Sequence, residues 1–168
     1  MGSRGGEVTP YIPGLRRYAR TMVDDPVEGD DLVQECLARV LAQKGPPGHV
    51  RNMRAYLFKV LRNVQADRLS KRYRAMDAAA MENAQGQFYQ PPTQHLSLEL
   101  RDLASALARL PDDQRNVILL VGYEGLSYQD TAEVLDVPVG TVMSRLSRGR
   151  EALRRMMNRE VPYLRKVK

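Results

Sequence analysis

The most constraining feature of this sequence is a pair of helical patterns, separated by a proline, between Leu126 and Arg155. Ser127 with Asp130 three residues later resembles a capping box, so a first helix is predicted from about Tyr128 to Leu135. Val137-Pro138 then ends this helix, because a proline disfavours helical geometry in the residue before it and suits the first turn of the next helix. The stretch is therefore predicted to fold as two helices joined by a short turn.

The second helix of this pair, predicted from about Val139 to Met157, has an apolar side and a polar side. Its apolar side consists of Val142, Leu146, Gly149, Leu153 and Met156. The rest carries hydroxyl and guanidinium groups, on Thr141, Ser144 and Arg148, with Arg145 at the edge and Arg150 on the flank. Such groups donate to base edges and phosphates in a major groove wide enough for a helix. The pattern predicts a helix-turn-helix that reads DNA, although a solvated arginine-rich face has the same pattern.

The charge of the chain is unevenly distributed. Its 168 residues carry 26 Lys and Arg against 20 Asp and Glu, and the formal net charge of +6 favours an anionic partner, nucleic acid before a membrane surface. Basic residues dominate from Arg51 to Arg74 and again from Arg145 to Lys168, whereas Asp24 to Glu35 holds six acids and no base. The sequence thus predicts two basic surfaces and one acidic block.

Several classes of function are disfavoured by composition. Cys36 is the sole cysteine, and His49 and His95 are the only histidines, so neither a disulfide nor a zinc ligand set is expected, and no cofactor is predicted. No nucleophile-base pair or phosphate-cradling glycine loop is present, so no catalytic residue is predicted and an enzyme is not expected. Without an apolar run long enough to span a bilayer or a signal peptide, we expect a cytoplasmic protein that does not insert into membranes.

The N-terminal part is predicted to form three helices. The first has an apolar stripe from Ile12 to Met22, the second opens at Asp30-Asp31 and buries Cys36, and the third runs from Met53 to about Arg72. The next stretch, Asp77 to Leu96, is rich in Gln, Ala and Pro and poor in branched apolar residues, which is typical of a linker. We therefore expect an all-α fold with two small helical domains, residues 1–76 and 98–168, joined by a flexible linker at 77–97.

Three stretches, in order, resemble the sigma factor family of bacterial RNA polymerase in its short, extracytoplasmic-function form. DDLVQECLARVLAQ (Asp30 to Gln43) is similar to the part that holds the clamp helices of the largest polymerase subunit. The stretch from Asn52 to Arg74 resembles the segment that opens and reads the minus-ten promoter element, and Leu107 to Arg155 resembles the domain that reads the minus-thirty-five element. The resemblance implies core RNA polymerase and promoter DNA as partners, and an anti-sigma protein that holds the factor inactive.

The resemblance also assigns candidate residues. Those for core polymerase binding are Asp30, Asp31, Gln34 and Glu35, on an acidic face that suits a basic helical partner, although Asp30 and Asp31 also fit a helix cap. Those for minus-ten DNA are Arg54, Tyr56, Lys59, Arg62, Asn63, Asp67, Arg68 and Arg72. The cations suit phosphates and an aromatic ring supports an unstacked base. Asn63 and Asp67 share a helix face, which allows either mutual bonding or reading of a flipped base.

Two positions depart from the family pattern. Tyr56 stands where these proteins usually have tryptophan, and Phe58 lies on a different side of the helix, so one of the two rings is expected in the core. Met143 replaces the usual Lys or Arg after the GTV of the reading helix. Two rival functions stay open: a sigma mimic that binds an anti-sigma protein without activating promoters, and a stand-alone helix-turn-helix repressor.

Overall fold

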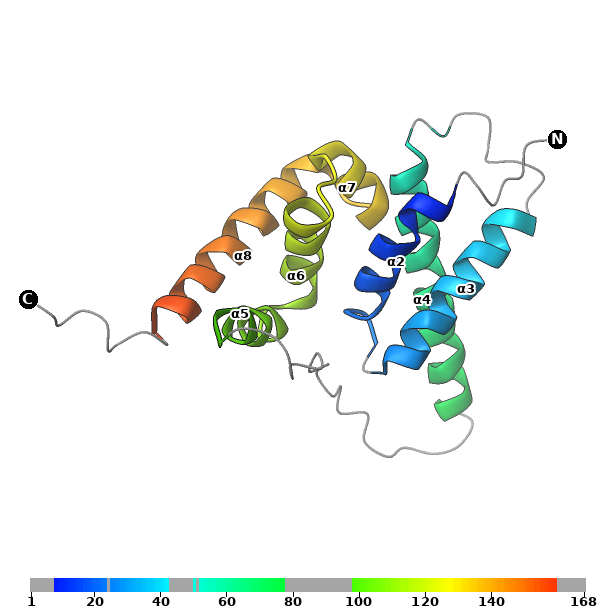
Figure 1. Cartoon of the computed structure of the whole chain (residues 1–168), viewed down its shortest axis with the longest axis horizontal. Coiled ribbons are helices and arrows are strands. Elements are labelled where there is room, and N and C mark those ends of the chain that lie inside the picture. Colours follow the sequence, from blue (N-terminus) through cyan, green and yellow to red (C-terminus); the bar gives the residue numbers. More distant parts are fainter. Residues whose placement is uncertain (1–7, 24, 43–49, 51, 78–97, 160–168) are drawn as a thin grey trace, which may run out of the picture. The chain divides into compact units, whose positions relative to one another are not determined.

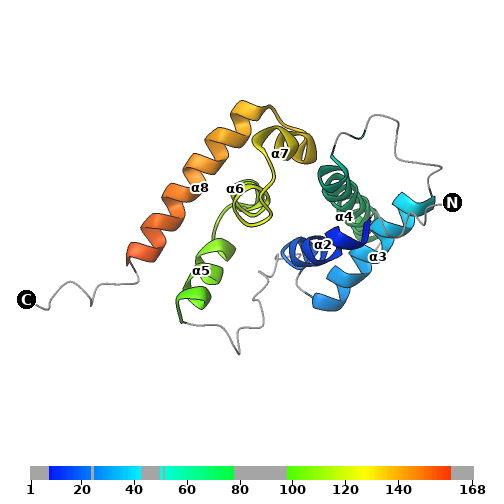
Figure 2. The same cartoon turned by 45° about the horizontal axis from the view of Figure 1, so that its top comes forward.

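The computed structural model describes residues 8–23, 25–42, 50, 52–77 and 98–159. Within these ranges all regular structure is helical, which confirms the all-α prediction. The chain divides into two compact units. The first contains the 3-10 helix η1 (Thr9–Tyr11) and the α-helices α2 (Ile12–Ala19), α3 (Pro26–Ala42) and α4 (Met53–Asp77). The second contains α5 (Leu98–Ala108), α6 (Asp112–Ile118), the π-helix η2 (Leu119–Tyr123), most of α7 (Tyr128–Leu135), and α8 (Val139–Arg159) (Figures 1 and 2).

The predicted linker lies almost entirely outside the described residues. Residue 77 is the last of α4, and 78–97 are not described. The predicted domain boundaries therefore stay a prediction.

The first unit packs α2, α3 and α4 around an apolar core. The rings of Tyr18 and Phe58 meet edge to face, with centroids 5.4 Å apart and planes at 71°. Phe58 is thus the core aromatic of the pair that the sequence left open, and Tyr56 stays partly exposed. Cys36 is buried as predicted, and burial raises the pKa of its thiol to about 12. Its role is packing, since the reactive thiolate is absent at neutral pH.

The second helix begins earlier than the sequence analysis predicted. Asp25 caps α3: its carboxylate accepts a hydrogen bond from the backbone N–H of Val27 at 2.9 Å. Pro26 occupies the first helical position, where its missing N–H has no cost. The prediction that Asp30-Asp31 opens this helix was therefore wrong. The acidic run offers several residues able to cap, and the cap forms on the one that precedes the proline.

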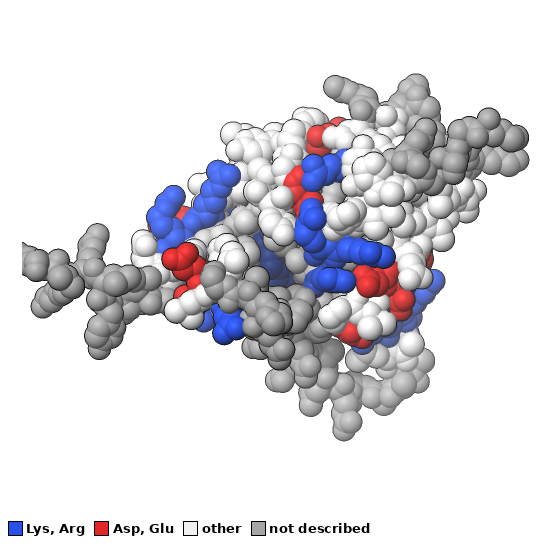
Figure 3. Space-filling model, in the orientation of Figure 1, with Lys and Arg blue, Asp and Glu red and all other residues white. Residues whose placement is uncertain are grey.

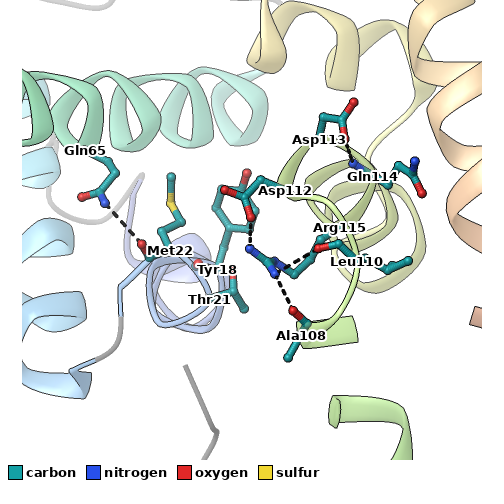
Figure 4. A network of polar contacts seen from close by, with 10 residues as sticks. All are labelled: Tyr18, Thr21, Met22, Gln65, Ala108, Leu110, Asp112, Asp113, Gln114 and Arg115. Carbon is teal, nitrogen blue, oxygen red and sulfur yellow. Dashed lines mark hydrogen bonds and ion pairs between the residues drawn. The ribbon is translucent and has the colours of Figure 1, made fainter. Parts of the chain in front are cut away.

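The third helix, α4, begins at Met53 as predicted but ends at Asp77, beyond the predicted end at about Arg72. The side-chain oxygen of Asn52 accepts from the backbone N–H groups of Arg54 and Ala55 at 3.1 and 3.3 Å, which caps the start of α4. Further along, Gln65 Nε2 donates to the carbonyl of Met22 at 3.2 Å (Figure 4). This bond ties the middle of α4 to the chain just after α2.

In the second unit, one arginine closes the turn between α5 and α6. Arg115 donates to the carbonyls of Ala108 and Leu110 at 3.2 and 3.4 Å and pairs with Asp112 (Figure 4). Carbonyls at a helix end have no partner within the helix, so this arginine supplies one.

The predicted helix-turn-helix is confirmed, together with its cap. The hydroxyl of Ser127 accepts from the backbone N–H of Asp130 at 3.0 Å and donates to its carboxylate at 2.8 Å, at the start of α7. The helix ends at Asp136, which takes up the left-handed conformation with φ 53°. The carbonyl of Pro138 then accepts from the N–H groups of Thr141 and Val142, which starts α8. The predicted proline break therefore coincides with an aspartate turn that the sequence analysis did not predict.

Candidate nucleic-acid and polymerase interfaces

The second helix of the helix-turn-helix, α8, has the two-sided character that its sequence predicted. Val142 and Leu146 are buried, while Ser144 and Arg148 are exposed on the outer side. Arg148 lies along this side, with Nε 3.3 Å from the carbonyl of Ser144 and Nη2 3.4 Å from its hydroxyl. Met143 is 53% exposed beside them. This stretch of the helix therefore presents the guanidinium group of Arg148, the hydroxyl of Ser144 and the thioether of Met143 to the outside.

The remaining DNA-binding candidates on α8 differ in how exposed their side chains are. Arg150 is exposed and Thr141 is half-buried. Arg145 is only 27% exposed, and its Nε lies 3.2 Å from a carboxylate oxygen of Asp113 at the start of α6. To contact DNA, Arg145 would have to exchange this partner for a phosphate or a base.

One glycine sets how closely α8 approaches α6, a role that sequence analysis missed. A Cβ at Gly149 would lie 2.7 Å from Cδ1 of Ile118 and 3.3 Å from Cβ of Gln114. Real Cβ atoms essentially never come as close as 2.7 Å to another heavy atom. The sequence does contain one indication of this role: Gly149 lies among the leucines of a buried stripe, and a glycine in such a stripe indicates a close contact between helices.

On the first unit, the minus-ten candidates lie along α4. Lys59 and Asn63 are exposed and Arg62 is half-buried. The guanidinium carbon of Arg54 lies 6.0 Å from the centroid of the Phe58 ring, a cation-π distance that restricts this side chain. Arg72 Nη1 is 3.8 Å from a carboxylate oxygen of Glu28 on α3, and its side chain is largely exposed.

The acidic candidates on α3 separate into two groups. Asp31 and Gln34 are exposed. Asp30 instead faces α2, where one of its carboxylate oxygens is 3.7 Å from Nε of Arg16 and 3.5 Å from Nη2 of Arg20. An internal partner makes Asp30 a weaker candidate for polymerase docking than its two exposed neighbours.

Glu35 joins the predicted polymerase face to the predicted DNA face. Its Oε2 accepts from Nε of Arg68 on α4 at 2.8 Å, and its Oε1 accepts from Nη2 of Arg39 at 2.7 Å. Arg39 also donates from Nη1 to Asp67 Oδ2 at 2.6 Å. Asp67 is thus bonded to Arg39, and the mutual bond with Asn63 that the sequence allowed does not form. We call Glu35, Arg39, Asp67 and Arg68 the α3–α4 ion network.

The charge of Glu35 is stabilised by this network. The hydrogen bond from Arg68, helped by that from Arg39, lowers the pKa of its carboxyl although partial burial opposes the shift. Because the pKa of Glu35 is lower in the folded state than its ordinary value of 4.5, its ionised carboxylate stabilises the folded protein at pH values above 4.5. This contribution is lost as the pH falls through the folded-state pKa.

We therefore expect Glu35→Gln to lower the free energy of unfolding at pH 7 by up to about 1 kcal/mol, since the pairs are partly exposed. The difference from the unchanged protein should shrink at an acidic pH well below 4.5, where the Glu35 carboxylate takes up a proton. Urea unfolding at both pH values measures it. A difference that is the same at both pH values would contradict the role of the arginines in holding the carboxylate ionised.

Acidic and basic side chains are interleaved on this protein. On the face drawn in Figure 3, Asp and Glu side chains lie directly beside Lys and Arg side chains.

Among the described residues no group of His, Cys, Asp and Glu is arranged to hold a metal ion. Within the same ranges, no helix is both long and apolar enough to cross a membrane.

Comparison with known protein families matches both units. Residues 100–153 match the model described as Sigma-70, region 4, and residues 8–62 match the model described as the sigma2 domain of PhyR. The ECF RNA polymerase sigma factor EcfG of Rhodopseudomonas palustris is 37% identical over 147 residues, which cover 88% of this chain and 81% of EcfG. SigW of Bacillus subtilis, another ECF sigma factor, is 31% identical over 160 residues, covering 88% and 84%.

A solved structure agrees with these relatives. The sigma factor RpoE of Bartonella quintana, in complex with the anti-sigma factor NepR, superposes with a TM-score of 0.74 at 32% identity, covering 95% of this chain and 98% of RpoE. Fold and matches together define a sigma-type factor of the bacterial transcription machinery, a class of regulators rather than enzymes. Within that class, the chain belongs to the extracytoplasmic-function (ECF) family of RNA polymerase sigma factors.

Proposed function

We propose that this chain is an active sigma factor, which binds core RNA polymerase, recognises the minus-thirty-five and minus-ten elements of a promoter and assists DNA melting. Its target is a stress- or signal-responsive regulon. The observation that carries the proposal is the family membership, together with a helix-turn-helix whose second helix exposes Ser144 and Arg148. These are groups that read base edges in a major groove.

Each element has a separate task in this proposal. The exposed residues Asp31 and Gln34 of α3 dock on the clamp helices of the largest polymerase subunit, and the cations of α4 follow the phosphates of the opened strand. Tyr56 supports an unstacked base. The two units, joined by one chain, then engage two promoter elements together, and the tether gives the second contact a high effective concentration.

An anti-sigma protein is proposed as a further partner of the chain. RpoE, the solved relative with 32% identity over 95% of this chain, is bound to the anti-sigma factor NepR. We place the free protein in the cytoplasm, where the polymerase is.

The proposal is tested by transcription in vitro with purified core polymerase on a library of genomic fragments. An active sigma factor produces discrete transcripts whose upstream regions share two sequence elements. Because residues 8–62 match the sigma2 domain of PhyR, a group that includes sigma mimics, the second candidate is a mimic that sequesters an anti-sigma protein. Absence of transcripts, combined with tight binding to an anti-sigma protein, would favour that candidate.

The polymerase contact makes a separate prediction. Asp31→Lys should weaken core binding by at least about 1 kcal/mol, because it opposes like charges across the interface. Asp31 is preferred to Glu35, whose reversal would also break the α3–α4 ion network. Fluorescence anisotropy with labelled protein measures the affinity, and Glu99→Lys, the same charge reversal on exposed α5, is the matched control. Equal affinity of Asp31→Lys and Glu99→Lys for core would remove Asp31 from the interface.

A further inference from the structure

The α3–α4 ion network brings together residues that the sequence assigned to two different partners. Glu35 was assigned to polymerase, Asp67 and Arg68 to minus-ten DNA, and Arg39 to neither. Arg39 nonetheless bonds to both carboxylates, at 2.7 Å to Glu35 and 2.6 Å to Asp67. Arg39 therefore links the two predicted surfaces, beside the direct pair of Glu35 with Arg68.

The geometry of Arg39 depends on its being an arginine. A guanidinium group is planar and holds its N–H donors in a fixed fork, so its two terminal nitrogens can bond to two carboxylates at once. Here Nη1 bonds to Asp67 and Nη2 to Glu35, which lies one helical turn away on α3. A lysine at this position would keep the charge but lose the fork.

The network orients side chains more than it holds the helices together. The buried residues Leu57, Phe58, Leu61 and Val64 form the apolar side of α4. Ion pairs that are partly exposed, as these are, add little to stability beside such a core. Asp67 is 54% exposed, so one side of its carboxylate is bonded to Arg39 while the group as a whole remains open to solvent.

A carboxylate next to DNA needs such a partner. An ionised aspartate accepts hydrogen bonds from the amino group of a base, but its charge repels the phosphates around it. Arg39 compensates this charge and also fixes the direction in which the free lone pairs of Asp67 point. In the same way, Glu35 is bonded to both Arg39 and Arg68, so neither acid of the network is left uncompensated.

We propose that Arg39 is a positioning residue for promoter reading: it holds the Asp67 carboxylate on α4 in the orientation that accepts from an unstacked base, and it couples this orientation to the α3 helix. The inference rests on the proposed sigma function. Arg39 acts through Asp67 and does not itself contact the base.

The test uses the protein bound to saturating core polymerase and a pool of single-stranded DNA oligonucleotides with randomised bases. The unchanged protein selects a preferred sequence from the pool. Arg39→Ala should lose roughly tenfold in affinity for the selected oligonucleotide, the size of one base contact. It should also lose preference at the same base position as Asp67→Asn. The double variant should be no worse than either single one, because the two residues act as one unit.

Two further variants separate positioning from charge and from general surface effects. Arg39→Lys keeps the positive charge that Arg39→Ala removes. Compared with Arg39→Ala, it should therefore bind unselected DNA more tightly but should still lack the base preference. Arg154→Ala removes a 2.8 Å exposed ion pair with Glu151 on α8 and should bind the selected oligonucleotide as the unchanged protein does. Circular dichroism checks that every variant keeps its helical content.

The outcomes distinguish the inference from the proposed function. If the unchanged protein selects no sequence, minus-ten reading by α4 is wrong and the inference fails with it. If it selects a sequence and Arg39→Ala keeps the same preference, or binds more tightly, only the inference is overturned. Recovery of the base preference by Arg39→Lys would also overturn it, because charge alone would then suffice.

Discussion

Arg148→Ala should weaken binding to the matched minus-thirty-five element by about 1–3 kcal/mol and relax the preference at one base position. The physical reason is that Arg148 lies on the exposed side of α8, over Ser144, where its guanidinium group can donate to a guanine edge. Arg150→Ala should instead weaken binding to all sequences alike and lower the salt slope by about one unit, as expected for a phosphate contact on the flank.

The measurement is binding of both variants to a panel of promoter fragments at several salt concentrations. Arg154→Ala is again the matched control, because Arg154 lies further along the same helix and pairs with Glu151. If neither Arg148→Ala nor Arg150→Ala changes affinity or preference, the outer side of α8 is a solvated face. The sigma-mimic candidate would then take the lead.

Gly149→Val should destabilise the second unit by about 1–3 kcal/mol, the usual effect of overpacking a close contact. The first added carbon would already lie 2.7 Å from Ile118 Cδ1, and the branches of valine leave the neighbouring helix less room to adjust. The end of the Ile118 side chain can rotate away, but Gln114 Cβ, at 3.3 Å, is fixed to the backbone of α6, so we expect the branches of valine to push α8 away from α6. Affinity for promoter DNA should therefore fall together with stability.

Gly140→Val is the matched control for this prediction. Gly140 lies in the first turn of the same helix, and a Cβ there would meet nothing within 4 Å. Its replacement should leave stability unchanged or slightly higher, since valine is the better helix former. Urea unfolding with hydrogen exchange of the α6 and α8 amides measures both variants. A Gly149→Val protein as stable as Gly140→Val would contradict the prediction, because the Ile118 side chain would then make room without strain between α8 and α6.

Helix ends follow from the sequence where the residues that fix them lie close together in the chain. The start of α7 was predicted closely, because Ser127 and Asp130 act on backbone groups within a turn of themselves. Its end at Leu135 was predicted from Val137-Pro138, although the turn itself is made by Asp136. The start of α3 was predicted at Asp30, and was wrong, because an acidic run contains several residues that can cap. Local chemistry decides helix ends well only where one candidate is present.

By itself the sequence determined the all-helical class, the two-sided pattern of α8 and the resemblance to sigma factors. These depend on periodicity and on motifs of neighbouring residues. Only the tertiary structure decided the partners of the candidate side chains. Arg39 and Asp67 are 28 residues apart, and Glu35 and Arg68 are 33 apart, so their pairing depends on how α3 packs against α4. A charged side chain selects whichever opposite charge the packing brings near, and no local pattern specifies it.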